Sequence, residues 1–236
     1  MLPSLITHWT LDTLFPRYCV GCGASDAAIC ADCRRLVIEV KQQQCIKCRA
    51  ISKMGATCPK CRPTAPIKQT IVALQFGDGP VREALHWLKY HGRRDVMEAL
   101  MPHLNNNADV ATVLRHLPKS DAIIVPVPLH RRRQWWRGFN QSATISQALS
   151  RKYNIETTNL LSRHAFEHTQ SGLHRDERAR NVGQVFVAQK PSLIKDKTIV
   201  LVDDIVTTGA TLIACAEVLK KAGAKSIIAI VLTQAQ

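Results

Sequence analysis

The sequence predicts an α/β protein with a mostly parallel sheet and a small cysteine-rich module at its N-terminus. Eight of the nine cysteines form four Cys-x-x-Cys pairs within the first 61 residues. Downstream, short apolar runs rich in β-branched residues alternate with amphipathic helical segments, a pattern typical of a parallel sheet. With 236 residues and 46% hydrophobic residues, the chain is large enough for one medium α/β domain and a small module. We expect a boundary between residues 1–66 and 67–236.

The cysteine pairs predict two structural zinc sites. Each pair directs two sulfurs at one ion, and a tetrahedral zinc ion takes four thiolates in a closed site that leaves no position for a reacting water. The ligands are Cys19, Cys22, Cys30, Cys33, Cys45, Cys48, Cys58 and Cys61. Redox pairs of the thioredoxin kind, disulfides and an iron–sulfur cluster are the alternatives. A redox pair normally occurs once beside a βαβ unit, and disulfides fit poorly with a chain start that lacks the features of a secretion signal.

The sequence does not fix the pairing of these ligands, but chain entropy favours one scheme. Consecutive ribbons, with the first two pairs around one ion and the last two around another, close shorter loops than a cross-braced scheme. The predicted module spans residues 17–63, and the proline-marked stretch 62–66 is a stiff linker.

The remaining elements are expected from periodicity and from breakers such as Pro80 at a helix start and Gly92 at a helix end. In chain order they are a strand at 70–76, a helix at 80–91, a helical stretch at 94–117 broken at 105–107, a strand at 122–127, a helix at 139–153, strands at 184–188 and 198–202, a helix at 212–222, and a strand at 226–232.

The segment 199–211 carries the strongest functional signal. Residues 198–202 are apolar without alternation, as in a strand covered on both faces. Asp203 and Asp204 follow at the carboxyl end, where ligands bind in open α/β sheets, so they are candidates to accept hydrogen bonds from a diol such as ribose O2 and O3. A βα turn with a capping residue is the plain structural alternative.

The loop after these carboxylates suits a phosphate. It leads into a helix, whose first N–H groups are unpaired and favour an anion, and glycine allows close approach. The expected phosphate-loop residues are Val206, Thr207, Thr208, Gly209, Ala210 and Thr211. No Gly-Lys-Ser/Thr follows, so this is not a Walker P-loop.

A basic segment follows the strand at 122–127. The formal charge of +14, about +10 once eight thiolates hold two zinc ions, points to polyanionic partners or phosphorylated substrates. The arginines expected in this loop to face a pyrophosphate or a nucleic-acid backbone are Arg131, Arg132, Arg133 and Arg137. Trp135 and Trp136 could stack bases, or could instead pack against the zinc module.

Three further positions enter the prediction. Lys89 lies at a helix end. Arg178 belongs to the arginine-rich stretch 168–181, which suits either a mobile cover over an anionic substrate or a plain surface helix. Cys215 is expected in the core.

These motifs resemble two known families. The segment 199–211 resembles the phosphoribosyl-pyrophosphate (PRPP) motif of type I phosphoribosyltransferases. The chain as a whole resembles the ComF family of competence and DNA-utilisation proteins through the double zinc ribbon and, in order, LKYHG, VPVPLH, RGFNQ, QSGLHRDERARN and VDDIVTTGAT. The resemblance implies a type I phosphoribosyltransferase-like fold that binds PRPP or a related ribose phosphate, with Mg²⁺ if transfer occurs.

The resemblance also implies residue roles and a setting. Residues 207–211 would hold the phosphate, Asp203 and Asp204 the ribose hydroxyls as the catalytic pair, and residues 131–137 the pyrophosphate; Lys89 and Arg178 are further pyrophosphate or DNA contacts. The implied role is the cytoplasmic handling of imported single-stranded DNA, with a DNA-uptake helicase or recombination proteins as partners. No apolar run has membrane-spanning length.

Two functions from different classes agree with this pattern. One is a phosphoribosyltransferase with an unidentified acceptor. The other is a non-catalytic adaptor that binds single-stranded DNA and retains a phosphate or PRPP-sensing pocket.

Overall fold

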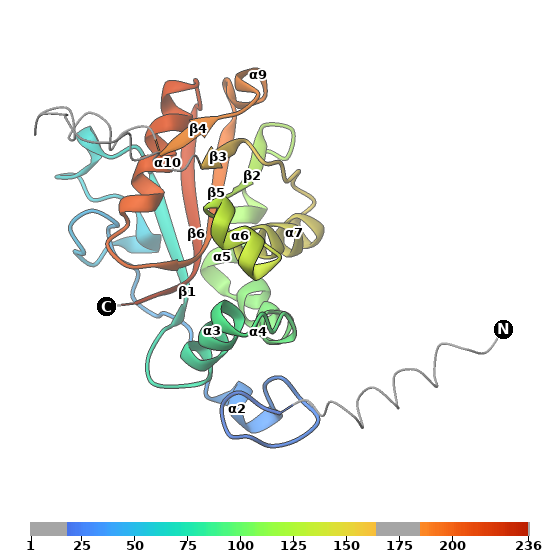
Figure 1. The fold of residues 1–236 in the computed structure, drawn as a ribbon. Coiled ribbons are helices and arrows are strands. Elements are labelled where there is room, and N and C mark those ends of the chain that lie inside the picture. Colours follow the sequence, from blue (N-terminus) through green and yellow to red (C-terminus); the bar gives the residue numbers. More distant parts are fainter. Residues whose placement is uncertain (1–17, 164–184, 236) are drawn as a thin grey trace, which may run out of the picture.

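The computed structural model describes residues 18–163 and 185–235 (Figure 1). Four strands form the central sheet in the order β1-β6-β5-β2, and every neighbouring pair is parallel. Their bounds are Gln69–Gln75 for β1, Ala122–Pro126 for β2, Thr198–Val206 for β5 and Ser226–Gln234 for β6. The central strands β5 and β6 are buried along almost their whole length, as the apolar runs 199–202 and 227–232 within them require. The predicted parallel α/β sheet is therefore confirmed.

Helices cover both faces of this sheet, so the domain has three layers (Figure 1). On one face lie α3 (Pro80–Tyr90), α4 (Asp95–Asn106), α5 (Ala108–Arg115) and α7 (Gln141–Tyr153). The other face is covered by α10 (Ala210–Lys221). The shorter elements are α2 (Ala31–Arg35), the 3₁₀ turns η1 (Lys53–Gly55) and η2 (Arg62–Thr64), α6 (Arg131–Arg137), α9 (Pro191–Ile194), β3 (Leu161–Arg163) and β4 (Phe186–Ala188).

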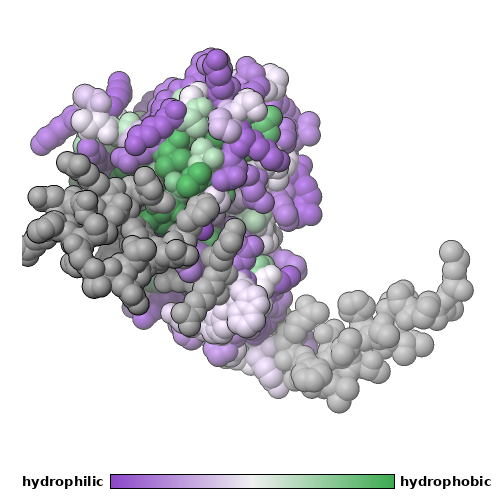
Figure 2. Space-filling view, turned by 45° about the horizontal axis from the view of Figure 1, so that its top comes forward, coloured by the Kyte–Doolittle hydropathy of each residue, from purple (hydrophilic) through white to green (hydrophobic). Residues whose placement is uncertain are grey.

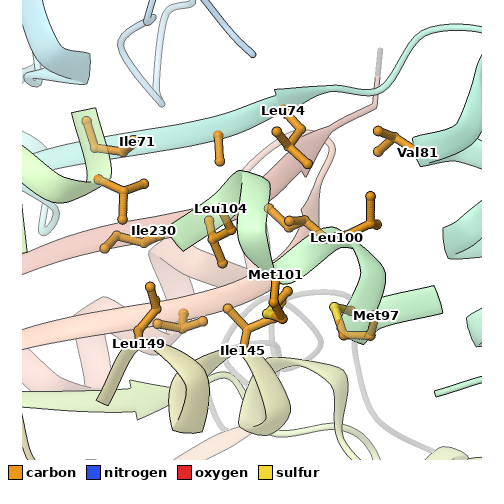
Figure 3. Close-up of a cluster of buried hydrophobic side chains, with 14 of the residues drawn as sticks. Ile71, Leu74, Val81, Met97, Leu100, Met101, Leu104, Ile145, Leu149 and Ile230 are labelled. Carbon is orange, nitrogen blue, oxygen red and sulfur yellow. The ribbon is translucent and has the colours of Figure 1, made fainter. Parts of the chain in front are cut away.

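The larger core lies between the sheet and α4 and α7. Figure 3 shows Leu104 of α4 among Ile71 and Ile230 of the sheet and Ile145 and Leu149 of α7. All five side chains are fully buried. Burying each such side chain contributes about 1.5–3 kcal/mol, so this layer holds α4 and α7 against the sheet.

Several expected boundaries change. β5 continues to Val206 instead of ending at residue 202, because its pairing with β6 persists to Gln234. The helix expected at 212 begins at Ala210. The expected stretch 94–117 is two helices that meet at Asn107, whose side chain caps the second. The strand β3 was not predicted; it pairs with β4 in a separate antiparallel sheet.

The segment 131–137 is a helix, not the expected loop. Its backbone closes helical hydrogen bonds from Gln134 N–H to the His130 carbonyl and from Gly138 N–H to the Gln134 carbonyl. Gly138 then ends the helix at φ 72°, a left-handed conformation that glycine adopts without strain.

The zinc-ribbon module is joined to the sheet by hydrogen bonds. Glu39 forms an antiparallel bridge with Leu74, Val40 N–H donates to the Ala73 carbonyl, and Gln75 N–H donates to the Ile38 carbonyl. These residues cover β1, which is otherwise an exposed edge of the sheet. A domain boundary at 66/67 stays a prediction.

Figure 2 shows hydrophilic residues around an apolar area on the part of one face that is drawn in colour. Within residues 18–163 and 185–235, no helix is both long and apolar enough to cross a bilayer.

Candidate functional site

Two four-cysteine clusters form in the N-terminal module. Cys19, Cys22, Cys30 and Cys33 make the first, and Cys45, Cys48, Cys58 and Cys61 the second; within each, the sulfurs lie within 4.8 Å of one another. Tetrahedral zinc with Zn–S bonds of about 2.3 Å places sulfurs roughly 3.8 Å apart, so the clusters fit the ion. The consecutive pairing is confirmed, and all nine cysteines are free of disulfides.

Backbone donors tune the sulfurs of both clusters. Burial raises the pKa of the Cys19 thiol, but hydrogen bonds from the backbone of Cys30, Cys22 and Gly21 outweigh it and lower the pKa to about 6. The Cys30 N–H lies 3.3 Å from the Cys19 sulfur. Cys45 has the same balance and also a pKa of about 6. A thiolate is the form that binds zinc, so the local backbone favours ligation by Cys19 and Cys45, whereas burial and the neighbouring sulfurs raise the pKa of Cys33 and Cys61.

The carboxylates Asp203 and Asp204 lie within β5, not beyond its end. They are 9% and 8% exposed. Asp203 Oδ1 accepts hydrogen bonds of 2.9 Å from Ser142 Oγ and from the Asp204 N–H. Burial, and then the charge of Asp204, raise the pKa of Asp203 to about 8. Asp203 is therefore a buried, protonatable group held by α7, and both carboxylates lie inside β5 near its carboxyl end instead of following an expected strand end at residue 202.

Asp204 of β5 faces the ammonium group of a lysine in α3. Lys89 Nζ, in the last turn of α3, lies 3.8 Å from Asp204 Oδ2, and both side chains are largely buried. Asp204 Oδ1 accepts from the Ile205 N–H at 2.8 Å. The fold thus brings together Lys89 and Asp204, 115 positions apart in the chain.

The phosphate-loop candidates divide between three elements. Val206 ends β5, residues 207–209 form the connection, and Ala210 and Thr211 open α10. Gly209 is the N-cap residue at φ 82° and has no side chain to cap the helix. Thr207, Thr208 and Thr211 are exposed, so the first turn of a twelve-residue helix meets solvent beside three hydroxyl groups.

The basic helix α6 exposes its aromatic residues. Trp135 is 86% exposed and Trp136 is 60% exposed, so neither packs against the zinc module. Arg137 is half-buried. The side chains of Arg131, Arg132 and Arg133, and all of Arg178, lie outside the part of the chain that can be described.

Three site residues were missed by the sequence reasoning. Ser142 bonds Asp203. Asn140 caps α7 by accepting from the Ser142 N–H at 3.1 Å, and its amide donates to the Val127 carbonyl at the end of β2. Gln141 is 1% exposed, and its amide has no hydrogen-bond partner within the described chain. An asparagine two residues before a serine at a helix start is the signal that would have found the first two.

Comparison with family models finds two matches in chain order. Residues 10–62 match the double zinc ribbon domain, and residues 140–236 match the phosphoribosyl transferase domain.

Individual relatives match between about half and nearly all of the chain. The DNA utilization protein YhgH of Escherichia coli O157:H7 is 31% identical over 227 residues, which cover 96% of this chain and 91% of that protein. Competence protein F of Haemophilus influenzae is 38% identical over 114 residues, 48% of this chain and 50% of the relative. Competence protein ComFC of Bacillus subtilis is 24% identical, with 84% and 80% covered.

Among solved structures, an allosteric regulatory enzyme of purine biosynthesis aligns with 58% of this chain and 26% of its own length. The sequence identity is 17% and the TM-score 0.40, a similarity too weak to add to the sequence relationship.

Proposed function

Because the chain belongs to the ComF family of competence and DNA-utilisation proteins, with a double zinc ribbon and a phosphoribosyltransferase domain, we propose that it binds PRPP or a related ribose phosphate and acts on imported single-stranded DNA in the cytoplasm. The observation that carries the proposal is the pair formed by Asp204 and Lys89 near the carboxyl end of β5, the strand that leads through residues 207–209 into the start of α10. An uncapped helix start holds phosphate, and a carboxylate holds a diol, so the arrangement suits a sugar phosphate.

The phosphate would lie on the connection 207–209 and the first turn of α10. There the helix start lies beside three exposed threonines, Thr207, Thr208 and Thr211, and Thr208 Oγ1 accepts from the Ala210 N–H at 3.4 Å. Charge-assisted hydrogen bonds to a phosphate are about twice as strong as neutral ones, so the loop is suited to a doubly charged 5′-phosphate.

The ribose and the pyrophosphate would lie farther along the same edge of the sheet. Asp204 is placed to accept from a ribose hydroxyl, and Lys89 to balance the charge of the leaving group. Asp203, which accepts a hydrogen bond from Ser142, would hold this part of β5 against α7. Mg²⁺ would arrive with the pyrophosphate, since it binds mostly through substrate phosphates and retained waters and supplies charge neutralisation.

A calorimetric titration of PRPP with Mg²⁺ tests the proposal. Wild type should bind, and Asp204→Asn should weaken binding at least tenfold, because an amide is a poorer acceptor and leaves Lys89 without its counter-charge. Asp121→Asn is the matched control, since Asp121 lies at the opposite, amino end of the sheet in an exposed pair with Lys197. No binding by wild type, or equal loss in both variants, would contradict the site.

The second candidate is a non-catalytic adaptor for single-stranded DNA. It is favoured by the exposure of Trp135 and Trp136 on a helix with four arginines. Single-stranded nucleic-acid sites combine such aromatic platforms with positive charge. Release of pyrophosphate from PRPP and Mg²⁺ in the presence of candidate bases or amines separates the two functions, because only a transferase releases it.

A further inference from the structure

The second zinc ribbon packs directly against the phosphate loop. Ile46 lies inside the turn between Cys45 and Cys48, and its side chain is buried. A Cβ atom added to Gly209 would lie 2.9 Å from Ile46 Cδ1, closer than real contacts allow. The turn that holds the zinc ligands and the N-cap of α10 are therefore in van der Waals contact.

Arg49, the residue after this turn, bonds to the loop itself. Its guanidinium Nη2 donates to the Thr207 carbonyl oxygen. With the Gln234 amide turned so that its oxygen faces the arginine, the same guanidinium also donates to the last residue of β6. One side chain thus links the zinc ribbon to the ends of both central strands.

The backbone of Arg49 is unusual for an arginine. In the first ribbon the corresponding residue is Gly23, and the two turns have matching hydrogen bonds: Gly23 N–H to the Cys19 carbonyl at 2.8 Å, and Arg49 N–H to the Cys45 carbonyl at 2.9 Å. Both residues have positive φ, 78° for Gly23 and 64° for Arg49. Glycine adopts this conformation without cost, whereas a residue with a Cβ is strained there. An arginine in the glycine position indicates that its side chain is used.

We propose that Arg49 is a positioning residue for the phosphate site and that it sets the orientation of the Thr207–Thr208 peptide. In a trans peptide the carbonyl and the next N–H point in opposite directions. Holding the Thr207 carbonyl against the zinc ribbon therefore directs the Thr208 N–H away from the ribbon, where it serves as a donor to the 5′-phosphate. This inference rests on the proposed function. It makes the second zinc ribbon a part of the phosphate site.

The variant Arg49→Gly separates this role from a structural one. Glycine suits the backbone at φ 64°, so the zinc content should stay at two ions per chain and the melting temperature should stay equal or rise. Affinity for PRPP with Mg²⁺ and for inorganic phosphate should fall about tenfold, the loss expected when one charge-assisted hydrogen bond no longer orients a donor. Arg49→Lys keeps one donor and should restore part of the affinity. Arg35→Ala, which removes the same charge from an exposed position in the first ribbon, should change neither property.

The backbone amide signal of Thr208, followed by NMR, gives a readout that does not depend on PRPP. It should differ between wild type and Arg49→Gly, and only in wild type should it shift strongly on addition of inorganic phosphate. If wild type binds PRPP and Arg49→Gly binds it equally well, the positioning role is overturned. If wild type binds no PRPP, the proposed function fails, and an unchanged Thr208 signal in Arg49→Gly then overturns the positioning role independently.

Discussion

Gln43 and Val72 pair through two hydrogen bonds of 3.0 Å, in which the side-chain amide of Gln43 takes the place of a neighbouring strand. Its nitrogen donates to the Val72 carbonyl, and its oxygen accepts from the Val72 N–H. The same nitrogen donates to Asp109 Oδ2 of α5 at 2.9 Å. A single buried amide therefore joins the zinc ribbon to the edge of the sheet and to a helix.

Replacing the single side chain of Gln43 should lower the stability of the protein strongly. Gln43→Ala leaves both backbone groups of Val72 without this partner, and each unsatisfied buried group costs about 1–3 kcal/mol. We expect a loss of roughly 2–4 kcal/mol in the free energy of unfolding by urea, against little change for the exposed neighbour Gln42→Ala. An equal loss of stability in Gln43→Ala and Gln42→Ala would show that the buried Gln43 amide contributes no more than an exposed glutamine does.

The stability of the ligand-free protein should depend on pH through Asp203. Its pKa is about 8 in the folded protein and about 3.9 when unfolded, so the folded state binds the extra proton between these values. The free energy of unfolding should therefore fall as pH rises from about 4 toward 8. Between pH 6 and 8, where zinc ligation persists, the loss from this group is on the order of 2 kcal/mol.

Asp203→Asn supplies the comparison. An amide oxygen still accepts from Ser142 but carries no charge, so the variant should lose less stability over the same pH range. Asp121→Asn should behave like wild type. Parallel pH profiles for wild type and Asp203→Asn would exclude Asp203 as the cause.

Gly209→Ala should impair the phosphate loop in two ways. The φ of 82° costs about 1–2 kcal/mol for a residue with a Cβ, and the added carbon meets Ile46. Gly92→Ala is the matched control, because Gly92 has a φ of 65° and open space around it. Chemical unfolding should show a larger loss for Gly209→Ala. Ile46→Ala removes a buried side chain and is itself destabilising, so the comparison is made within that background, where adding Gly209→Ala should cost no more than Gly92→Ala does in wild type. An undiminished cost of Gly209→Ala in that background would place the whole effect in the backbone.

Purified protein should contain two zinc ions per chain, measured by elemental analysis. Cys58→Ser should lower the content to about one ion, because three remaining thiolates no longer close the second site. A chelator should release both ions and unfold the ribbons. Iron in place of zinc, or one ion in wild type, would contradict the two four-cysteine sites.

Binding of single-stranded DNA should separate into a stacking and an electrostatic part. Trp135→Ala with Trp136→Ala should lower affinity at every salt concentration, since base stacking contributes roughly 1–3 kcal/mol per base. Arg131→Ala with Arg132→Ala should instead flatten the salt dependence, which has a log–log slope of about −0.7 per neutralised phosphate on single strands.

Fluorescence anisotropy of a labelled oligonucleotide at several salt concentrations measures both effects. Arg35→Ala with Arg151→Ala is the charge control outside α6. If neither α6 double variant changes binding, that helix is not the DNA contact.

Local patterns in the sequence determined the metal sites and the order of the elements. Four Cys-x-x-Cys pairs specify two four-thiolate sites, because each turn brings its two sulfurs together whatever surrounds it. Unbroken apolar runs such as 198–202 specify buried parallel strands, because only a sheet covered on both faces removes such runs from water. The glycine at the start of α10 is likewise a local signal, because a positive φ at this position favours glycine.

Only the tertiary structure decided what each site residue faces. Asp203 accepts a hydrogen bond from Ser142 of α7, and the partner of Asp204 is Lys89 of α3. Neither contact has a signature in sequence spacing, because each arises from how a helix packs across the sheet. The sequence likewise did not decide whether Trp135 is exposed, since an aromatic residue can pack in a core or stack on a base at the surface. The contact between Arg49 and Thr207 spans 158 residues and depends on the ribbon pairing with the edge of β1, a long-range arrangement that local propensity does not encode.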